Sequence, residues 1–466
     1  MSGPEIITLG CRLNMAESEA MRGLVRHEDD LIIVNSCAVT NEAVRQTRQA
    51  IRRAKRARPG ARLIVTGCAA QVEPESFAAM PEVDRVIGNR EKMFSENFTA
   101  AVRAEPVEAL PFPLVEGETR KGLRQAQAER GLGFGVSGPY IRVSDIMAVK
   151  ETAPHLAAGF SERSRAFVEV QNGCDHRCTF CIIPYGRGNS RSVPAGLVVE
   201  RIRSLAEEGF NEVVLTGVDV TSYGPDLPGA PTLGALIERI LRHVPELPRL
   251  RLSSLDCIEM DDRLFELATG EPRFMPHLHM SFQAGDDMVL KRMKRRHSRR
   301  DAVETVARLK AKRPGIAIGA DLIAGFPTES DEMAENSLRL VDECDIVMGH
   351  IFPFSPKRGT PAARMPQVSP DIAKLRARRL REACAARQAM WLQGLVGTLQ
   401  KVLVEREDGS GHAENFAPVR VRHSSESWNP TALKKGDSSL RWNDVGRIVE
   451  VRIAAIDNGT LIGAPL

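Results

Sequence analysis

The chain has 466 residues, of which 42% are hydrophobic and 27% charged, and its formal net charge is +4. This length predicts two or three domains, and without a run of about 18 apolar residues no membrane-spanning helix is expected. The start lacks a basic segment leading into an apolar one, so we expect no secretion and a cytoplasmic protein. In that reducing compartment the nine cysteines are expected to be ligands or buried thiols rather than disulfides.

Residues 1–135 are predicted to form a first domain, in which short apolar runs alternate with helical patterns. The apolar runs at 6–9, 31–34 and 63–66 indicate buried parallel strands, and 14–27 and 41–57 indicate helices. This alternation predicts an α/β fold with a doubly wound βαβ domain.

A cysteine closes each of these three strands, namely Cys11, Cys37 and Cys68. Ligands of open α/β sheets gather outside the carboxyl ends of the strands, so thiols placed there can converge although they are distant in sequence. The alternative is three unrelated buried cysteines, since cysteine is among the most buried residue types. We interpret them as three protein ligands of an iron–sulfur cluster with one open iron.

Residues 160–392 are predicted to form a central domain in which strands and helices again alternate. The expected strands are 167–170, 212–216, 250–253, 278–281, 316–321 and 346–352, and the expected helices are 195–208, 232–243, 299–312 and 329–342. Six such strands predict a partial (βα) barrel with its active site at the carboxyl ends of the strands.

Cys174, Cys178 and Cys181 form a Cys-x-x-x-Cys-x-x-Cys run directly after the first of these strands. Three thiolates on one loop suit an iron–sulfur cluster that leaves one iron open. The alternative is a structural zinc knuckle, which normally fills all four positions with paired Cys-x-x-Cys or Cys/His sets. The spacing resembles the radical S-adenosylmethionine (SAM) superfamily, in which the open iron binds the amino and carboxylate groups of SAM. A lone histidine such as His176 in this loop is expected to be a surface or capping residue.

Residues 395–466 are predicted to form a small antiparallel β-barrel, with strands near 400–405, 417–421 and 446–453. Such a barrel is either a nucleic-acid clamp or a stabilising cap. Two polar segments, 104–134 and 423–444, resemble translated copies of mobile palindromic repeats of bacterial genomes, so we expect surface insertions. Trp428 and Trp442 fall in the second segment and are therefore not expected to stack on bases.

The motifs at 8–14, 35–40, 65–71 and 171–181, with others at 215–219, 277–283 and 321–327, resemble the methylthiotransferase family of radical-SAM enzymes. The terminal barrel resembles the TRAM domain, whose implied role is tRNA binding. Residues 252–259 look most like the branch that modifies threonylcarbamoyladenosine. The chain departs from that branch at Cys257, where proline is expected, and many family members have glycine at the position of Thr328.

The resemblance implies a tRNA methylthiotransferase that converts N6-threonylcarbamoyladenosine next to the anticodon to its 2-methylthio derivative. It implies two [4Fe-4S] clusters, the one on Cys174, Cys178 and Cys181 cleaving SAM to a radical and the other presenting sulfur. The alternatives are action on isopentenyladenosine in tRNA, action on a ribosomal protein aspartate, or a non-catalytic iron–sulfur protein that binds RNA. An electron donor such as flavodoxin or ferredoxin is implied, and neither DNA nor a membrane is an expected partner.

Residues at the ends of central strands are candidates for binding SAM, and the alternative for each is a strand cap or a turn. They are Thr216, Gly217, Asp219, Ser281, Gln283 and Gly325. Phe180 is predicted either to stack on the adenine or to pack in the core. Cys257, Cys344 and Cys384 lie outside both sets and are expected to be ordinary buried thiols.

Two basic runs, at 45–58 and 291–300, have the composition of phosphate-binding surfaces. Their alternative is a solvated helix face, and we favour RNA binding for 291–300 because it follows a strand end on the expected active face. Recognition of the base would then involve an unstacked loop nucleotide.

Overall fold

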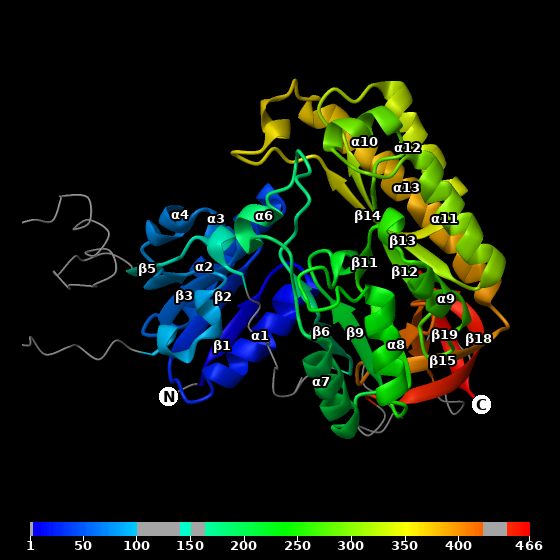
Figure 1. Cartoon of the computed structure of the whole chain (residues 1–466), viewed down its shortest axis with the longest axis horizontal. Helices are drawn as coiled ribbons and strands as arrows, with labels where there is room; N and C mark the ends of the chain where they lie inside the picture. The colour runs from blue at the N-terminus through cyan, green and yellow to red at the C-terminus, as the bar shows by residue number, and fades with distance from the viewer. Residues whose placement is uncertain (1–2, 100–139, 151–163, 423–444) are drawn as a thin grey trace, which may run out of the picture.

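The computed structural model describes residues 3–99, 140–150, 164–422 and 445–466. Figure 1 shows an N-terminal sheet domain, a larger partial barrel and a small closed barrel near the C-terminus. The predicted insertions at 104–134 and 423–444, and with them Trp428 and Trp442, lie outside the described residues. The domain limits given above stay predictions. No helix in the described ranges is long and apolar enough to cross a membrane.

The N-terminal sheet is parallel throughout, with its five strands in sequence order. The strands are β1 (Glu5–Thr8), β2 (Leu31–Ser36), β3 (Arg62–Gly67), β4 (Arg85–Ile87) and β5 (Tyr140–Arg142), and the helices are α1 (Arg12–Leu24), α2 (Asn41–Ala57), α3 (Cys68–Val72) and α4 (Pro74–Ala78). Short 3-10 turns follow at Glu91–Met93 and Ser95–Asn97. The two shortest strands, β4 and β5, were not predicted.

Alternate residues of β2 point to opposite faces of this sheet, which is why both faces are covered by helices. Ile33 packs in one cluster with Met21 of α1, and Ile32 packs in another with Ile51 of α2. The predicted α/β arrangement with parallel strands is therefore confirmed, with helices on both faces of the sheet. Its strands end at the edge that faces the central domain (Figure 1).

The central domain is a partial barrel of parallel strands, as predicted. One sheet has the order β10-β9-β6 and the next β11-β12-β13-β14, and β10 and β11 are separated along the chain only by Ser253. The strands are β6 (Ala166–Glu169), β9 (Glu212–Thr216), β10 (Arg249–Leu252), β11 (Ser254–Leu255), β12 (His277–Gln283), β13 (Ala317–Ala324) and β14 (Ile346–Pro353). The six predicted strands are all present, three of them longer than expected.

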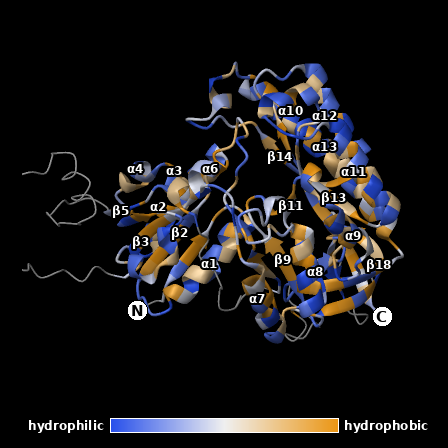
Figure 2. Ribbon diagram, viewed as in Figure 1, coloured by the Kyte–Doolittle hydropathy of each residue, from blue (hydrophilic) through white to orange (hydrophobic). Residues whose placement is uncertain are grey.

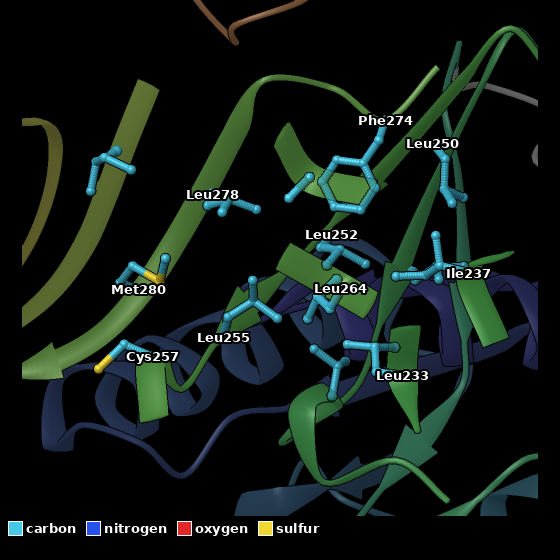
Figure 3. Close-up of a cluster of buried hydrophobic side chains, with 14 of the residues drawn as sticks. Leu233, Ile237, Leu250, Leu252, Leu255, Cys257, Leu264, Phe274, Leu278 and Met280 are labelled. Atoms are coloured by element: carbon cyan, nitrogen blue, oxygen red, sulfur yellow. The ribbon is translucent and has the colours of Figure 1, made fainter. Parts of the chain in front are cut away.

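Helices surround this barrel and bury its apolar outer face. They are α7 (Ala195–Glu207), α8 (Leu233–His243), α9 (Asp262–Gly270), α10 (Asp287–Met293), α11 (Arg299–Lys312), α12 (Asp331–Glu343) and α13 (Pro370–Leu395). Figure 2 shows the strands as hydrophobic ribbons between helices of mixed character. Figure 3 shows part of the core, in which Leu252 and Leu264 lie between Leu278 on one side and Ile237 on the other, with Cys257 at the edge.

The C-terminal domain is a closed five-stranded barrel, which follows the long helix α13. Its strands are β15 (Leu399–Val404), β16 (Ser410–Ala413), β17 (Pro418–Val421), β18 (Ile448–Asp457) and β19 (Thr460–Pro465). The small barrel was predicted correctly, but its purely antiparallel pairing was not, because β17 and β19 are parallel. Five strands cannot alternate direction around a closed ring, so one neighbouring pair must be parallel.

A buried group of charges joins the central domain to the C-terminal barrel. Arg251 donates to Glu212 at 2.8 Å and to the carbonyl of Glu414 at 3.1 Å, and Arg249 donates to the carbonyl of Lys401 at 2.9 Å. Although burial acts to raise it, the surrounding arginines lower the pKa of Glu212 to about 2. This junction is ionised and lies at the amino end of the barrel strands, away from the cysteines.

Candidate active site

All six cysteines singled out in the sequence line one cavity of about 350 Å³ between the N-terminal and central domains. We call Cys11, Cys37 and Cys68 the N-terminal triad, and Cys174, Cys178 and Cys181 the loop triad. The two triads come from different domains, so the cavity exists only where these domains meet.

The strand ends of the first sheet bring the N-terminal triad together. Cys11 caps α1, Cys37 follows β2, and Cys68 begins α3 directly after β3. A Cβ at position 10 would lie only 2.7 Å from the Cβ of Cys37, and Gly10 has a φ of +100°. Glycine is therefore required there for the chain before Cys11 to approach Cys37 so closely. Burial, together with the nearby thiols of Cys68 and Cys11, raises the pKa of the Cys37 thiol to about 12.

The loop triad lies between the two-residue strand β7 (Gln171–Asn172) and the short helix α6 (Ile183–Arg187). The loop folds tightly because Gly173, at a φ of +72°, lies against the carbonyl of Asn189, only 1.9 Å from where a Cβ would be. Burial raises the pKa of Cys181 to about 12. Cys178 differs, because hydrogen bonds with His176 and Arg295 outweigh burial and lower its pKa.

Each triad has its own arginine that donates to one of its sulfur atoms. Nε of Arg187 lies 3.1 Å from Sγ of Cys68, and Nη1 of Arg295 lies 3.8 Å from Sγ of Cys178. Arg295 is held by the carboxylate of Asp256 at 2.8 Å and by the carbonyl of Ser281 at 2.9 Å. Such donors favour the thiolate, the form of cysteine that binds metal.

The residues fit two iron–sulfur clusters, each with three protein ligands. Within the described residues every cysteine is free, so no disulfide competes for these thiols. Each triad offers three sulfurs that are close enough to influence one another's pKa. Three thiolates leave one coordination position of a four-iron cluster open to another molecule. The raised pKa values of Cys37 and Cys181 mean that these thiols release protons when they bind metal.

Four of the six SAM candidates line the cavity, namely Gly217, Asp219, Ser281 and Gln283. Backbone N–H groups of residues 218 and 219 donate to Oε1 of Gln171 at 3.1 and 2.9 Å, which fixes the loop that presents Asp219. Thr216 is buried at the end of β9, where its carbonyl accepts from the N–H of Val170 at 2.9 Å.

Gly325 is not among the cavity-lining residues either. It makes a turn at a φ of +73° against Ala373 of α13, where a Cβ would lie 2.4 Å from that of Ala373. Its N–H donates to Glu329 at 2.8 Å. Gly325 therefore makes a turn beside α13, and its contact with SAM stays a prediction.

His176 is half-buried in the cavity wall rather than on the surface. Its Nε2 lies 3.1 Å from Glu259 and 3.5 Å from Asp219, and Sγ of Cys174 lies 3.7 Å from Asp219. Phe180 also lines the cavity and meets Phe326 edge to face at 6.4 Å. The other three cysteines, Cys257, Cys344 and Cys384, are buried, as predicted.

Several residues of the site were not identified from the sequence. Arg187 and Asp256 both line the cavity. Asn14 also lines it and donates to the carbonyls of Leu9 and Ser36 at 2.7 and 3.1 Å. Asn14 and Asp256 had a signal, since they lie in the motifs at 8–14 and 252–259, whereas Arg187 had none.

The basic run at 291–300 is largely occupied within the protein. Arg295 pairs with Asp256, Arg296 with Glu259, and Arg299 with Glu343. In the run at 45–58, ion pairs join Arg45 to Glu42, Arg48 to Glu73, Arg52 to Glu82, Lys55 to Asp84 and Arg58 to Asp30. Most of these cations therefore have carboxylate neighbours.

A second cavity, of about 240 Å³, adjoins the back of the site and has a positive lining. Arg48, Lys357 and Arg358 line it together with a single carboxylate, Glu73. Lys357 is buried and donates to Oδ1 of Asn41 at 3.0 Å. We call this the basic pocket.

Comparison with known proteins agrees with this geometry. Residues 168–341 match the protein family described as "Radical SAM superfamily". Residues 4–88 match the one described as "Uncharacterized protein family UPF0004". A cobalamin-binding radical SAM methyltransferase, TsrM from Kitasatospora setae, has the same fold, with a TM-score of 0.51 at 15% identity over 78% of this chain and 77% of that one. The fold and the loop triad thus define a radical-SAM protein, with a [4Fe-4S] cluster and SAM as cofactors.

Named relatives identify the family within this class of radical-SAM proteins. The threonylcarbamoyladenosine tRNA methylthiotransferase MtaB of Rickettsia prowazekii is 47% identical, covering 90% of this chain and 91% of its own length. The protein of that name from Aquifex aeolicus is 33% identical over 86% and 92%. A tRNA-2-methylthio-N(6)-dimethylallyladenosine synthase of Alkalilimnicola ehrlichii is 33% identical over 98% and 96%. The chain belongs to the radical-SAM methylthiotransferase family.

Proposed function

We propose that this enzyme attaches a methylthio group to C2 of N6-threonylcarbamoyladenosine next to the anticodon of tRNA, in the cytoplasm. The single observation that supports this most is the shared cavity, which brings two incomplete thiolate sets together. The 47% identity to a relative named for that substrate favours threonylcarbamoyladenosine over the dimethylallyl analogue.

The reaction needs an unactivated aromatic C–H bond to become a C–S bond, which no side-chain acid or base can achieve. The iron–sulfur cofactor and SAM would supply the radical reactivity, with the loop triad holding one cluster and the N-terminal triad a second. The electron would come from a small donor protein such as flavodoxin or ferredoxin.

The chain's own residues would bind and orient SAM in the cavity. Asp219 is suited to the methionine ammonium, because it lies beside Cys174 and its carboxylate accepts from Ser222 at 2.8 Å. Ser281 and Gln283, at the end of β12, would bind ribose hydroxyls or the SAM carboxylate. Gly217 lies where a Cβ would be 2.7 Å from the carbonyl of Gln171, so a larger residue would displace the loop.

The basic pocket supports an RNA substrate. Its residues Ala38, Ala69 and Ile182 each directly follow a cysteine of a triad, so the pocket is separated from the main cavity by little more than the cysteine backbone. A phosphate of an RNA bound there would lie near the reacting nucleotide, and cationic side chains are the usual partners of phosphates.

The test is mass spectrometry of tRNA nucleosides from cells that lack this protein. We expect the 2-methylthio form of threonylcarbamoyladenosine to disappear while the unmethylthiolated form accumulates. Loss of the isopentenyl analogue instead would assign the other tRNA branch, and unchanged tRNA nucleosides would contradict the proposal.

A further inference from the structure

Arg187 is a residue of the central domain whose side chain ends among the sulfurs of the N-terminal triad. It is the last residue of α6, six positions after Cys181, and is only 3% exposed. Its Nε donates to Sγ of Cys68 at 3.1 Å. The same α6 thus follows one triad in the chain and contacts the other in space.

A closed ring of contacts holds this guanidinium in place. Arg187 binds both carboxylate oxygens of Glu17, at 2.6 and 3.0 Å, and Glu17 also accepts from Lys92 at 2.7 Å. Lys92 donates to Asn89 at 2.7 Å, and Nδ2 of Asn89 lies 3.8 Å from Sγ of Cys68. All side chains of this ring except that of Cys68 are buried. A bidentate pair fixes the orientation of a guanidinium as well as its position.

The ring leaves a surplus of positive charge beside the sulfurs. Arg187 and Lys92 are two buried cations, whereas Glu17 is one carboxylate whose pKa is lowered to about 2, by these two cations against the effect of burial. Within the ring two cationic side chains thus share one carboxylate. The positive charge of Arg187 faces ligands that become anionic when they bind iron.

We propose that Arg187 is a positioning residue that the central domain contributes to the cluster of the N-terminal triad. Its hydrogen bond to Cys68 and its charge stabilise the more negative, reduced cluster and so raise its reduction potential. Hydrogen bonds to sulfur and net charge are established determinants of such potentials. This inference rests on the proposed second cluster. It implies that the cluster has its working potential only when the two domains are docked.

The experiment uses the full-length chain with all three loop-triad cysteines replaced by alanine, so that only the N-terminal cluster contributes. The midpoint potential is measured anaerobically by redox titration followed by electron paramagnetic resonance, in this background and with Arg187→Lys or Arg187→Gln added. We expect the potential to fall in the order arginine, lysine, glutamine. Lysine keeps the charge, but as a compact ammonium it cannot span Glu17 and Cys68 as the planar fork does.

Arg295→Gln in the same background is the matched control, because Arg295 is a buried arginine that faces Cys178 instead of Cys68. Its potential should equal that of the background. Equal potentials for Arg187→Lys, Arg187→Gln and the control would overturn the inference. If Arg187→Gln loses its iron, Arg187→Lys decides: a lower potential than the background supports the inference and an equal one refutes it. Failure of the background itself to bind iron would instead refute the second cluster.

Discussion

The two cysteine triads differ in how the chain assembles them. The loop triad lies within eight consecutive residues, 174–181, whereas the N-terminal triad is collected from residues 11, 37 and 68 at the ends of three strands. One loop needs little more than its own tight turn to bring three sulfurs together. The dispersed triad needs a complete sheet, and it also receives Arg187 from the neighbouring domain. A local motif thus identifies a site on its own, while a dispersed one depends on fold and docking.

The largest expected effect comes from removing either triad as a whole. Replacing Cys174, Cys178 and Cys181 by alanine should abolish both cleavage of SAM to 5′-deoxyadenosine and formation of the methylthio nucleoside. Replacing Cys11, Cys37 and Cys68 should abolish only the nucleoside product and leave SAM cleavage. Chromatography of the small-molecule products and of digested tRNA measures both.

Iron content provides the control for this comparison. Each triple variant should bind about four iron atoms where the reconstituted wild type binds about eight. Replacing the buried Cys257 or Cys344, which lie outside both triads, should leave the iron content unchanged. Loss of SAM cleavage in the N-terminal triple variant would show that the two triads do not have separate roles.

A second test separates stability from cluster binding. Glu212→Gln leaves Arg251 and its neighbouring arginines without their buried carboxylate, which should destabilise the protein by about 3 kcal/mol. Unlike the ring at Arg187, this junction touches neither triad, so iron content should be preserved. Urea denaturation of the variant and of Glu200→Gln, an exposed glutamate on α7, measures the difference.

The pH dependence of this effect has a definite sign. The folded pKa of Glu212, about 2, is below that of an unfolded glutamate. The carboxylate therefore contributes stability above about pH 4.5, and this contribution is lost as the pH falls toward 2. The wild type and Glu212→Gln should accordingly become more alike in urea midpoint as the solution is acidified. A constant difference between pH 7 and pH 3 would contradict the ionised junction.

A smaller effect is expected for the basic pocket behind the triads. Replacing Arg48 and Arg358 by glutamine should weaken tRNA binding on the order of tenfold. It should also reduce the salt dependence of binding, by roughly 0.7 to 0.9 in logarithmic slope for each phosphate that the variant no longer binds. Arg53→Gln, an exposed arginine of α2 that does not line the pocket, is the control. Parallel salt curves for all three proteins would exclude the pocket as a phosphate site.

The smallest expected effect concerns one departure from the family pattern. Thr328 has a φ of +64°, in the left-handed region, which explains why many family members have glycine there. The left-handed backbone costs a residue with a Cβ about 1–2 kcal/mol of folding free energy, a cost that glycine avoids. Glycine loses more conformational entropy on folding, which offsets roughly 0.5–1 kcal/mol of that gain. Thr328→Gly should therefore stabilise the protein by about 0.5 kcal/mol in thermal denaturation. A lower melting temperature would show that the hydroxyl of Thr328 matters more than backbone strain.

The sequence predicted the parts of this molecule that depend on local patterns. The strand before Cys37 and the Cys-x-x-x-Cys-x-x-Cys run at 174–181 follow from apolar runs and spacing, and so the six thiols were found. Arg187 was not found, because its partner Glu17 is 170 residues away in another domain and no periodicity encodes docking. For the same reason no sequence pattern indicated the contact between Arg251 and Phe416 across a domain junction. The guanidinium carbon of Arg251 lies 4.8 Å from the centre of the Phe416 ring.

The central claim is that two clusters, each with three thiolates, face one cavity. Mössbauer spectroscopy of the anaerobically reconstituted full-length protein tests it most directly, with total iron determined on the same sample. We expect two [4Fe-4S] clusters per chain, each with one iron that has no protein thiolate. The spectrum of this iron in the loop-triad cluster should change when SAM is added. A single cluster per chain, or a second cluster with four equivalent cysteine-bound irons, would contradict the account.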